Sequence, residues 1–402
     1  MILDTDSTPP GWRLSTFGRE MLVRGGLVDP RDPVWSGTVL IAPNHIESGT
    51  GRVLARETAA EQGADSGKYV VRAGDLIYSK IRPALNKVAV ATEDCLCSAD
   101  MYPVVPAKEA DVRFCQYYML ADPFLTYAAL AADRVKMPKV NREELSAAPW
   151  LVPALAEQRR IADYLDRETA TIDALIDNQH ELLTKLKERR SAVIRHHLET
   201  GACMTDPVMG EVELNKPGWK CLPAKRVCNI RTGGEDSGNA TDGGEFPFYV
   251  RGARVLRSED HAFEGPAVLT PGDGQGGTGK VFHYAEGRFQ AHQRVYVFHG
   301  FRGLVAKYFY YWLSTFLREI ALASSYTVTM ESLRQPMLER LPVFFPEDPA
   351  EQDAIVRAIE ADVAKIDALI AKAERFIELA QERRAALITA AVTGQIEIPT
   401  ED

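Results

Sequence analysis

Two long stretches of the chain repeat one alternation of apolar and polar positions. In residues 153–201 the apolar side chains follow a four-three spacing, and residues 347–396 carry a second set in the same phase. Such a stripe is the seam of a helix that packs against another helix. The predicted pairing positions are Ile161, Leu165, Ile172, Leu175, Leu182 and Leu186 in the first stretch, and Ile355, Ile359, Ile366, Leu369 and Phe376 in the second.

The two stretches are copies of one another. A constant spacing of 194 positions relates Ala156-Glu157-Gln158 to Ala350-Glu351-Gln352, Ile172-Asp173-Ala174-Leu175-Ile176 to Ile366-Asp367-Ala368-Leu369-Ile370, and Glu188-Arg189-Arg190 to Glu382-Arg383-Arg384. At 1.5 Å per residue each helix would be roughly 60 Å long. One such stripe could simply face a globular core. Two phase-matched copies instead favour helices that pair with each other, antiparallel, because each helix returns from a separate domain.

Each helix follows a larger segment of different character, residues 1–152 and residues 202–346, and residues 397–402 form a tail. Both segments are rich in Val, Tyr, Phe and Thr, and Gly or Pro interrupts them about every 8–12 residues, which predicts short strands and turns. Helices are expected at 112–121 and 303–322. Both segments begin with Pro-Gly-Trp, at Trp12 and Trp219. The predicted fold class is α+β: two α/β domains, each followed by a long helix, with the helices forming an antiparallel coiled coil.

Charge and composition narrow the function. The net charge is −9, yet residues 347–402 hold 13 acidic and 6 basic residues, so the two larger segments are close to neutral and can carry basic patches. No apolar run approaches the ~20 residues of a membrane span, and the N-terminus does not resemble a signal peptide. Six cysteines in 402 residues do not indicate a disulfide scaffold, so a reduced, cytoplasmic protein is expected.

No motif of catalysis emerges. The loop from Gly272 to Lys280 contains a GxxxxGK pattern, but Val281 follows where a phosphate-binding loop needs Ser or Thr, so a hairpin loop is the better interpretation. The cysteines lack zinc-site spacing, and neither a nuclease set of acids nor a DNA-amino methyltransferase motif is found. We therefore expect no catalytic residue, metal or cofactor. A stand-alone endonuclease or methyltransferase with a divergent site, or a coiled-coil protein adaptor, remains an alternative.

Basic and amide side chains gather on predicted loops. Arg and Lys suit phosphates and guanine edges, and Asn and Gln suit adenine. The candidate DNA-binding residues are Arg72, Lys80, Arg82, Asn86, Lys87, Lys136, Lys139 and Asn141 in the first segment, and Arg251, Arg254, Gln275, Lys280, His292 and Arg294 in the second.

With these features the chain resembles the specificity (S) subunit of type I restriction–modification systems over nearly its whole length. The resemblance rests on the twin helices, the Gly-Trp openings and the run from Gly74 to Pro83 followed by Asn86-Lys87. It implies two target recognition domains, each reading one half of a split, asymmetric DNA sequence. It also implies that the helices fix the spacing and dock two methyltransferase (M) subunits, and that restriction (R) motor-nuclease subunits join the complex.

Overall fold

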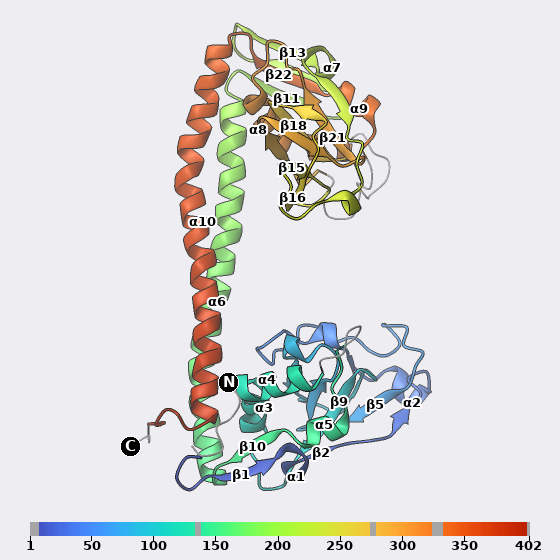
Figure 1. Ribbon diagram of the computed structural model, residues 1–402, viewed down its shortest axis with the longest axis vertical. Coiled ribbons are helices and arrows are strands. Elements are labelled where there is room, and N and C mark those ends of the chain that lie inside the picture. The colour runs from blue at the N-terminus through green and yellow to red at the C-terminus, as the bar shows by residue number, and fades with distance from the viewer. Residues whose placement is uncertain (1–7, 133–137, 274–278, 324–332, 400–402) are drawn as a thin grey trace. The chain divides into compact units, whose positions relative to one another are not determined.

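The computed structural model describes residues 8–132, 138–273, 279–323 and 333–399. The chain divides into two compact units: unit 1 comprises residues 1–180 and 374–402, and unit 2 comprises residues 181–373. This division falls within the two long helices, α6 (Leu155–Leu198) and α10 (Pro349–Val392). Each unit thus holds one mixed α/β domain and part of both helices (Figure 1), and each is described by itself.

The first domain, β1 to β10, is built on two four-stranded sheets and one two-stranded sheet. Their orders are β2-β9-β6-β7, β3-β5-β8-β4 and β1-β10. The strands are β1 Arg13–Thr16, β2 Met21–Val23, β3 Leu27–Val28, β4 Leu40–Ile41, β5 Lys68–Val71, β6 Leu76–Ser79, β7 Val88–Val90, β8 Cys95–Cys97, β9 Met101–Pro106 and β10 Pro149–Val152. The helices are α1 Phe17–Glu20, α2 Pro33–Ser36, α3 Val112–Leu120, α4 Asp122–Ala131 and α5 Arg142–Ser146, with 3-10 turns η2 Pro43–His45 and η3 Pro83–Leu85.

The second domain, β11 to β22, repeats this plan. Its sheets run β14-β21-β18-β19, β16-β15-β20-β17 and β13-β22, and a hairpin β11-β12 is added. The strands are β11 Ala202–Asp206, β12 Glu211–Leu214, β13 Trp219–Pro223, β14 Asn229–Thr232, β15 Phe246–Tyr249, β16 Val255–Ser258, β17 Phe263–Glu264, β18 Ala267–Pro271, β19 His283–Ala285, β20 Arg288–Ala291, β21 Val295–His299 and β22 Pro342–Pro346. The helices are α7 Ala224–Val227, α8 Ala306–Ala323 and α9 Gln335–Glu339, with a 3-10 turn η4 Ser237–Asn239.

The domains share one sheet and differ in the other. In the first sheet of the first domain, β9 pairs antiparallel with β2 and β6. In the second domain β21 takes the place of β9 and pairs antiparallel with β14 and β18. The second sheet of each domain contains one parallel pair, which is β4 with β8 in the first domain and β15 with β20 in the second. The fourth strand, however, is added at opposite edges: β3 lies beside β5, whereas β16 lies beside β15. Two unlike surfaces are therefore built on one repeated frame.

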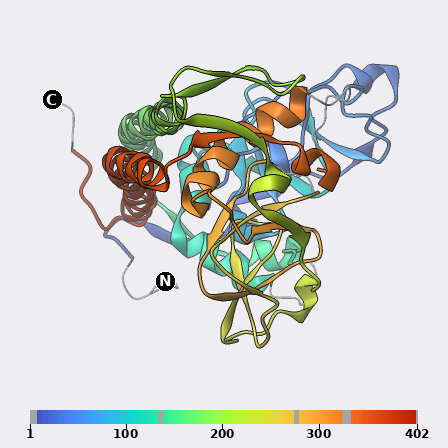
Figure 2. The same cartoon turned by 90° about the horizontal axis from the view of Figure 1, so that it is seen from above.

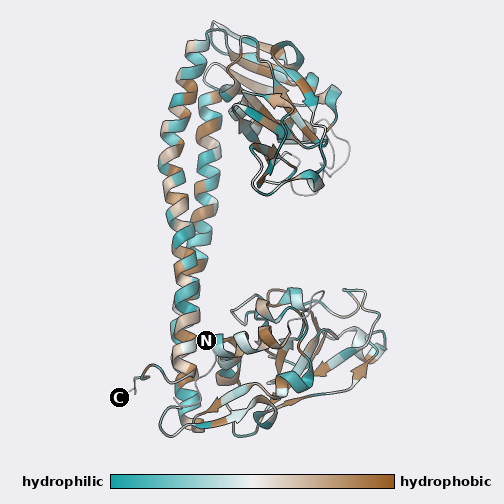
Figure 3. Ribbon diagram, viewed as in Figure 1, coloured by the Kyte–Doolittle hydropathy of each residue, from teal (hydrophilic) through white to brown (hydrophobic). Residues whose placement is uncertain are grey.

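Each long helix contributes to the core of the domain in its unit. Ile161 and Leu165 of α6 and Ile388 of α10 are buried in one cluster with the first domain's aromatic residues. Ile194 of α6 and Ile359 of α10 are buried in the second domain's cluster. Both helices carry hydrophobic positions among hydrophilic ones (Figure 3), as amphipathic helices do. Gly394, with φ +69°, follows the end of α10 and provides the left-handed residue that commonly ends a helix.

Polar side-chain contacts show that α6 and α10 run antiparallel. In unit 2, Arg190 pairs with Asp367 and His197 with Asp362, so partners move backwards along α10 as numbering advances along α6. In unit 1, Asp173 pairs with Arg384, while Ile161 shares a core with Ile388. The helices lie side by side in both views (Figures 1 and 2). The predicted fold class, with its antiparallel coiled coil, is confirmed.

The structure corrects the order of spacings along the seam. Of the predicted pairing positions, Ile161, Leu165, Ile172, Leu186, Ile359 and Ile366 are buried and Ile355 is partly buried. Leu175, Leu182, Leu369 and Phe376 are instead 40–50% exposed, and the buried positions are Ile176, Leu183 and Ile377. The spacing after Ile172 and Ile366 is four-then-three rather than three-then-four. Adjacent apolar residues such as Leu175-Ile176 make both phases equally apolar, so the pattern could not choose between them.

Candidate nucleic-acid interface

Gln158 and Gln352 hold equivalent places at the starts of the long helices. The Gln158 amide donates to Pro153 O at 2.9 Å and its Oε1 accepts from the backbone of Asp111 at 2.9 Å. The Gln352 amide donates to Pro346 O at 2.8 Å, and its Oε1 accepts from Val305 at 2.7 Å. Both glutamines are buried. Because Asp111 and Val305 precede α3 and α8, one contact fixes each domain to its own long helix.

A pair of charges reinforces this attachment in both units. Arg113 of α3 lies 2.7 Å from both Asp166 and Asp163 of α6. At the equivalent place in unit 2, Lys307 of α8 lies 2.6 Å from Glu360 of α10. The spacing of 194 positions therefore relates contacts as well as residues, and it extends from the long helices into the domains.

The Asp and Arg of the repeated motifs pair across the two helices. Asp173 accepts from Arg384 at 2.8 Å and Asp367 accepts from Arg190 at 2.7 Å. Arg384 also donates to the carbonyls of Gly49 (2.9 Å) and Thr50 (3.2 Å) in the first domain. Arg190 is 38% exposed, and among the described residues Asp367 is its only hydrogen-bond partner. One copy of the pair is thus enclosed by a domain loop, and the other is largely solvated.

The Gly-Trp openings meet the Thr-Gly ends of the helices. A methyl group added at Gly201 would overlap the indole of Trp219, and one added at Gly394 would press against Pro9 and Trp12. The end of α6 therefore packs on the start of the second domain. In unit 1 the end of α10 packs in the same way against Pro9 and Trp12, at the start of the first domain.

The structure places the first domain's candidate DNA-binding residues in three settings. Lys80 and Lys139 lie together, because the backbone at Ile81 bridges to Lys139. Arg82 is exposed and Arg72, also exposed, pairs with Asp94 at 2.6 Å. The others serve the domain itself: buried Asn86 donates to Leu120 O, Lys87 to Pro43 O, and Asn141 caps α5. Lys136 lies outside the described residues.

In the second domain two of the candidate cations already face a carboxylate. Arg251 and Arg294 both face Asp273, at 3.9 and 3.1 Å. His292 is buried, and its Nδ1 accepts from the backbone of Arg294 at 3.0 Å. Arg254 and Lys280 are exposed. Gln275 lies outside the described residues. The strands that flank the glycine-rich loop, β18 and β19, pair antiparallel, which confirms the hairpin predicted there.

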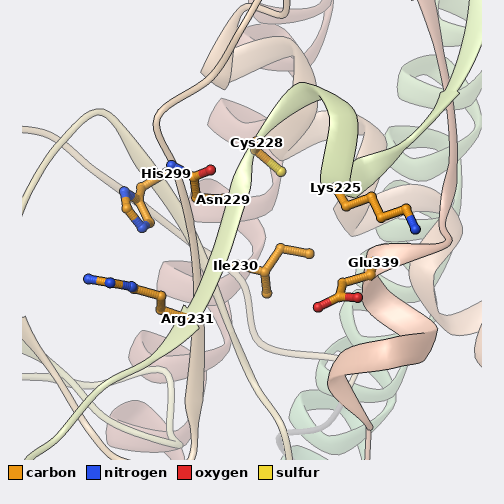
Figure 4. A pocket seen from close by; sticks show the side chains of 7 residues that line it. All are labelled: Lys225, Cys228, Asn229, Ile230, Arg231, His299 and Glu339. Atoms are coloured by element: carbon orange, nitrogen blue, oxygen red, sulfur yellow. The ribbon is translucent and has the colours of Figure 1, made fainter.

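A cavity of about 560 Å³ lies in the second domain beside α7, β14 and α9. Its lining is mixed (Figure 4): Lys225, Cys228, Asn229, Ile230, Arg231, His299 and Glu339. Burial raises the pKa of the Cys228 thiol to about 12, so it stays protonated at neutral pH and is a poor nucleophile. Burial also lowers the pKa of His299. The cavity is thus lined by mixed polar and apolar side chains, and its cysteine is not an activated nucleophile.

The residues that attach the domains were not predicted from sequence. Gln158, Gln352, Asp173 and Arg384 were visible as repeated letters, but a repeat does not say what a side chain contacts. Tyr69 and Tyr102, which lie against Lys80, gave no signal because their strands belong to different sheets. Across the described ranges, no three His, Cys, Asp or Glu side chains are grouped to hold a metal ion. None of the described helices is long and apolar enough to cross a membrane.

Known proteins resemble this chain in part of its sequence and in its fold. A family model described as the Type I restriction modification DNA specificity domain matches residues 217–377. The Type I restriction enzyme EcoDI specificity subunit of Escherichia coli is 35% identical over 188 residues, which are 47% of this chain and 41% of that protein.

The chain is similar to the specificity subunits of type I restriction–modification systems, and residues 217–377 match their DNA specificity domain.

The family resemblance drawn from the twin helices is thereby confirmed. The aligned region spans less than half of the curated relative. One solved structure extends the likeness in fold to nearly the whole chain. That chain comes from a structural study of complex assembly and conformational transition in the type I R-M system. The match covers 97% of this chain and 100% of that chain, with a TM-score of 0.70 and 19% identity. The HsdS subunit from Thermoanaerobacter tengcongensis covers 97% of this chain and 98% of its own length, with a TM-score of 0.45 and 19% identity.

Proposed function

We propose that this chain is the specificity subunit, the DNA-recognition component, of a type I restriction–modification complex. Each domain reads one half of a bipartite, asymmetric DNA target, and the paired helices hold the two readers at a set separation. The observation that carries the proposal is the repeated attachment of two unlike domains. Gln158 and Gln352 make the same contacts, while the second sheets differ in where the fourth strand is added.

The chemistry of the complex belongs, in this proposal, to its partners. The subunit itself is non-catalytic, and its helices dock methyltransferase subunits, two per chain, because the helix surface occurs twice. Restriction motor-nuclease subunits join that assembly in the cytoplasm. Recognition is non-covalent: cationic side chains position the DNA by its phosphates, and loop side chains contact base edges. The division into domains 1–152 and 202–346, helices 153–201 and 347–396, and tail 397–402 is part of this proposal.

Candidate DNA contacts are best placed where a cation is not already neutralised. Lys80, Arg82 and Lys139 meet that condition in the first domain, and Arg254 and Lys280 in the second. Arg72, Arg251 and Arg294 would have to exchange a carboxylate partner for DNA. We therefore expect the cations without a carboxylate partner to contact DNA before Arg72, Arg251 and Arg294 do.

Mapping of methylated bases in the host, with and without the gene, tests this function. We expect one split, asymmetric motif to lose its methylation on deletion and to regain it on complementation. A motif that persists without the gene would refute the assignment. Incubating the purified chain alone with DNA, a divalent metal and a methyl donor tests its non-catalytic role. Cleavage or methylation in that mixture would contradict it, provided a co-purified partner is excluded by mass spectrometry.

A further inference from the structure

Lys80 stands apart from the other cations of the first domain, because it is buried and unpaired. Its side chain follows β6 and is only 7% exposed. The Lys80 ammonium lies 4.7 Å from the centre of the Tyr102 ring and 5.8 Å from that of Tyr69. Within the described ranges no carboxylate lies within ion-pair distance of it. Aromatic faces compensate only part of the cost of burying an ammonium, so a bound anion would stabilise the Lys80 charge further.

Further positive charge gathers at this place. The Arg142 guanidinium lies 5.5 Å from the same Tyr102 ring, and it donates to the carbonyl of Arg24 rather than to an acid. Lys139 is held next to Lys80 by two backbone hydrogen bonds, from Val140 to Lys80 O at 3.0 Å and from Arg82 to Pro138 O at 2.8 Å. Burial, the charge of Lys139 and that of Arg142 lower the pKa of Lys80, and Asp100 acts in the opposite direction.

The backbone beside Lys80 is held in an uncommon conformation. Arg82 has φ 47° and Asn86 has φ 47°, in the left-handed region that residues other than glycine seldom adopt. The buried Asn86 amide, which donates to Leu120 O at 2.8 Å, anchors one end of this turn. Exposed Arg82 is thereby presented at the surface close to Lys80. Strained backbone of this kind costs free energy and is found mainly at functional sites, which favours a functional role for this turn.

We propose that Lys80, Lys139 and Arg142 form a seat for one backbone phosphate of the DNA bound by the first domain. The Lys80 ammonium supplies the buried charge, and the tyrosine rings hold it in place without neutralising it. Such a seat fixes the register of the domain on the duplex and carries no sequence information. This inference rests on the proposed function, because the phosphate belongs to DNA.

The test uses the full-length chain and two mixed-sequence duplexes of unrelated sequence, with affinity measured by fluorescence anisotropy at several salt concentrations. Lys80→Met keeps the aliphatic stem but removes the charge. We expect the slope of log K against log salt to fall by about 0.9, since one phosphate contact contributes about that much. The ratio of parent affinity to variant affinity should therefore fall about threefold to fourfold when the salt concentration rises from about 50 to 200 mM. The fall should be equal on both duplexes.

Two variants keep the test decisive. Lys139→Gln changes an exposed side chain, so it reports on the seat even if Lys80→Met does not fold, and it should lower the slope similarly. Arg56→Met removes one charge from the same domain, but Arg56 is 53% exposed and paired with Glu93, so the parent slope should remain.

Parent-like affinity and slope in folded Lys80→Met and Lys139→Gln would overturn the phosphate seat while leaving the proposed function intact. A loss confined to one duplex would also overturn it, because a base contact would then be the cause. Absence of any salt-dependent DNA binding by the parent chain would refute the proposed function, and the seat with it.

Discussion

Arg384 and Arg190 occupy equivalent positions in the two copies of the long helix, yet their surroundings differ. Arg384 is 6% exposed and binds Asp173 together with two carbonyls of the first domain. Arg190 and Asp367 are 38% and 47% exposed. An ion pair buried with extra hydrogen bonds leaves a costly uncompensated charge when one partner is removed. An exposed pair contributes little.

We therefore predict that Arg384→Met lowers the free energy of unfolding by about 3–5 kcal/mol, the usual loss when a buried pair is broken. The matched variant Arg190→Met should lower it by less than about 1 kcal/mol. Urea denaturation followed by circular dichroism measures both. Equal losses would show that the loop around Gly49 and Thr50 adds nothing to the pair.

His292 gives the second domain a pH dependence. Burial holds its pKa below the ordinary value of 6.5, and nearby Arg251 and Arg294 act in the same direction, whereas Asp236 and Asp273 oppose them. Its Nδ1 accepts from the Arg294 backbone, so a proton on that nitrogen would break the bond. The unfolded chain therefore binds a proton more readily than the folded domain does.

Stability from this residue is present above about pH 6.5 and is lost as the pH falls towards the folded-state pKa. In His292→Asn the amide oxygen can accept the same bond without titrating. We expect the variant to lose less unfolding free energy than the parent between pH 7.5 and 5.5. Part of the dependence should remain, because burial also lowers the pKa of His283 and His299. Identical pH profiles would contradict the role of His292.

At the scale of elements, the seam of the long helices was predictable in period but not in phase. The residues Leu175 and Ile176 are neighbours, yet Leu175 is 45% exposed and Ile176 only 9%. A helix turns about 100° per residue, so a choice between them redirects the stripe by more than a quarter turn. Packing against the partner helix, which is distant in sequence, determines that Ile176 rather than Leu175 is buried.

The same pair offers a direct test of the seam. Ile176→Ala removes buried apolar volume and should lower the free energy of unfolding by about 2–4 kcal/mol. Leu175→Ala removes a similar volume at an exposed position and should stay within about 0.5 kcal/mol of the parent. Thermal and urea denaturation of the two variants compare them. A larger loss for Leu175→Ala would restore the spacing expected from sequence.

For the whole molecule, the proposed role of the helices is to set the separation of two half-sites. Shortening both helices by one turn, about 5.4 Å each, would keep them antiparallel and change the reach between the readers. We predict a methylated motif with the same half-sites and an altered spacer. Methylation-site mapping of a host that carries the shortened gene provides the measurement, and an unchanged spacer would count against the helices as a ruler.

Features that depend on local period or on repetition could be predicted from sequence: the two long helices, their equivalence, the strand-rich domains and the family resemblance. Periodicity follows from backbone geometry, so neighbouring residues suffice to predict it. Features that depend on residues distant in the chain became visible in the folded molecule. The fold brought Lys80 against Tyr102, gave Asn86 and Lys87 partners inside the domain, and enclosed Arg384 but not Arg190. Whether a charged side chain is free for a ligand depends on such neighbours, and one sequence does not name them.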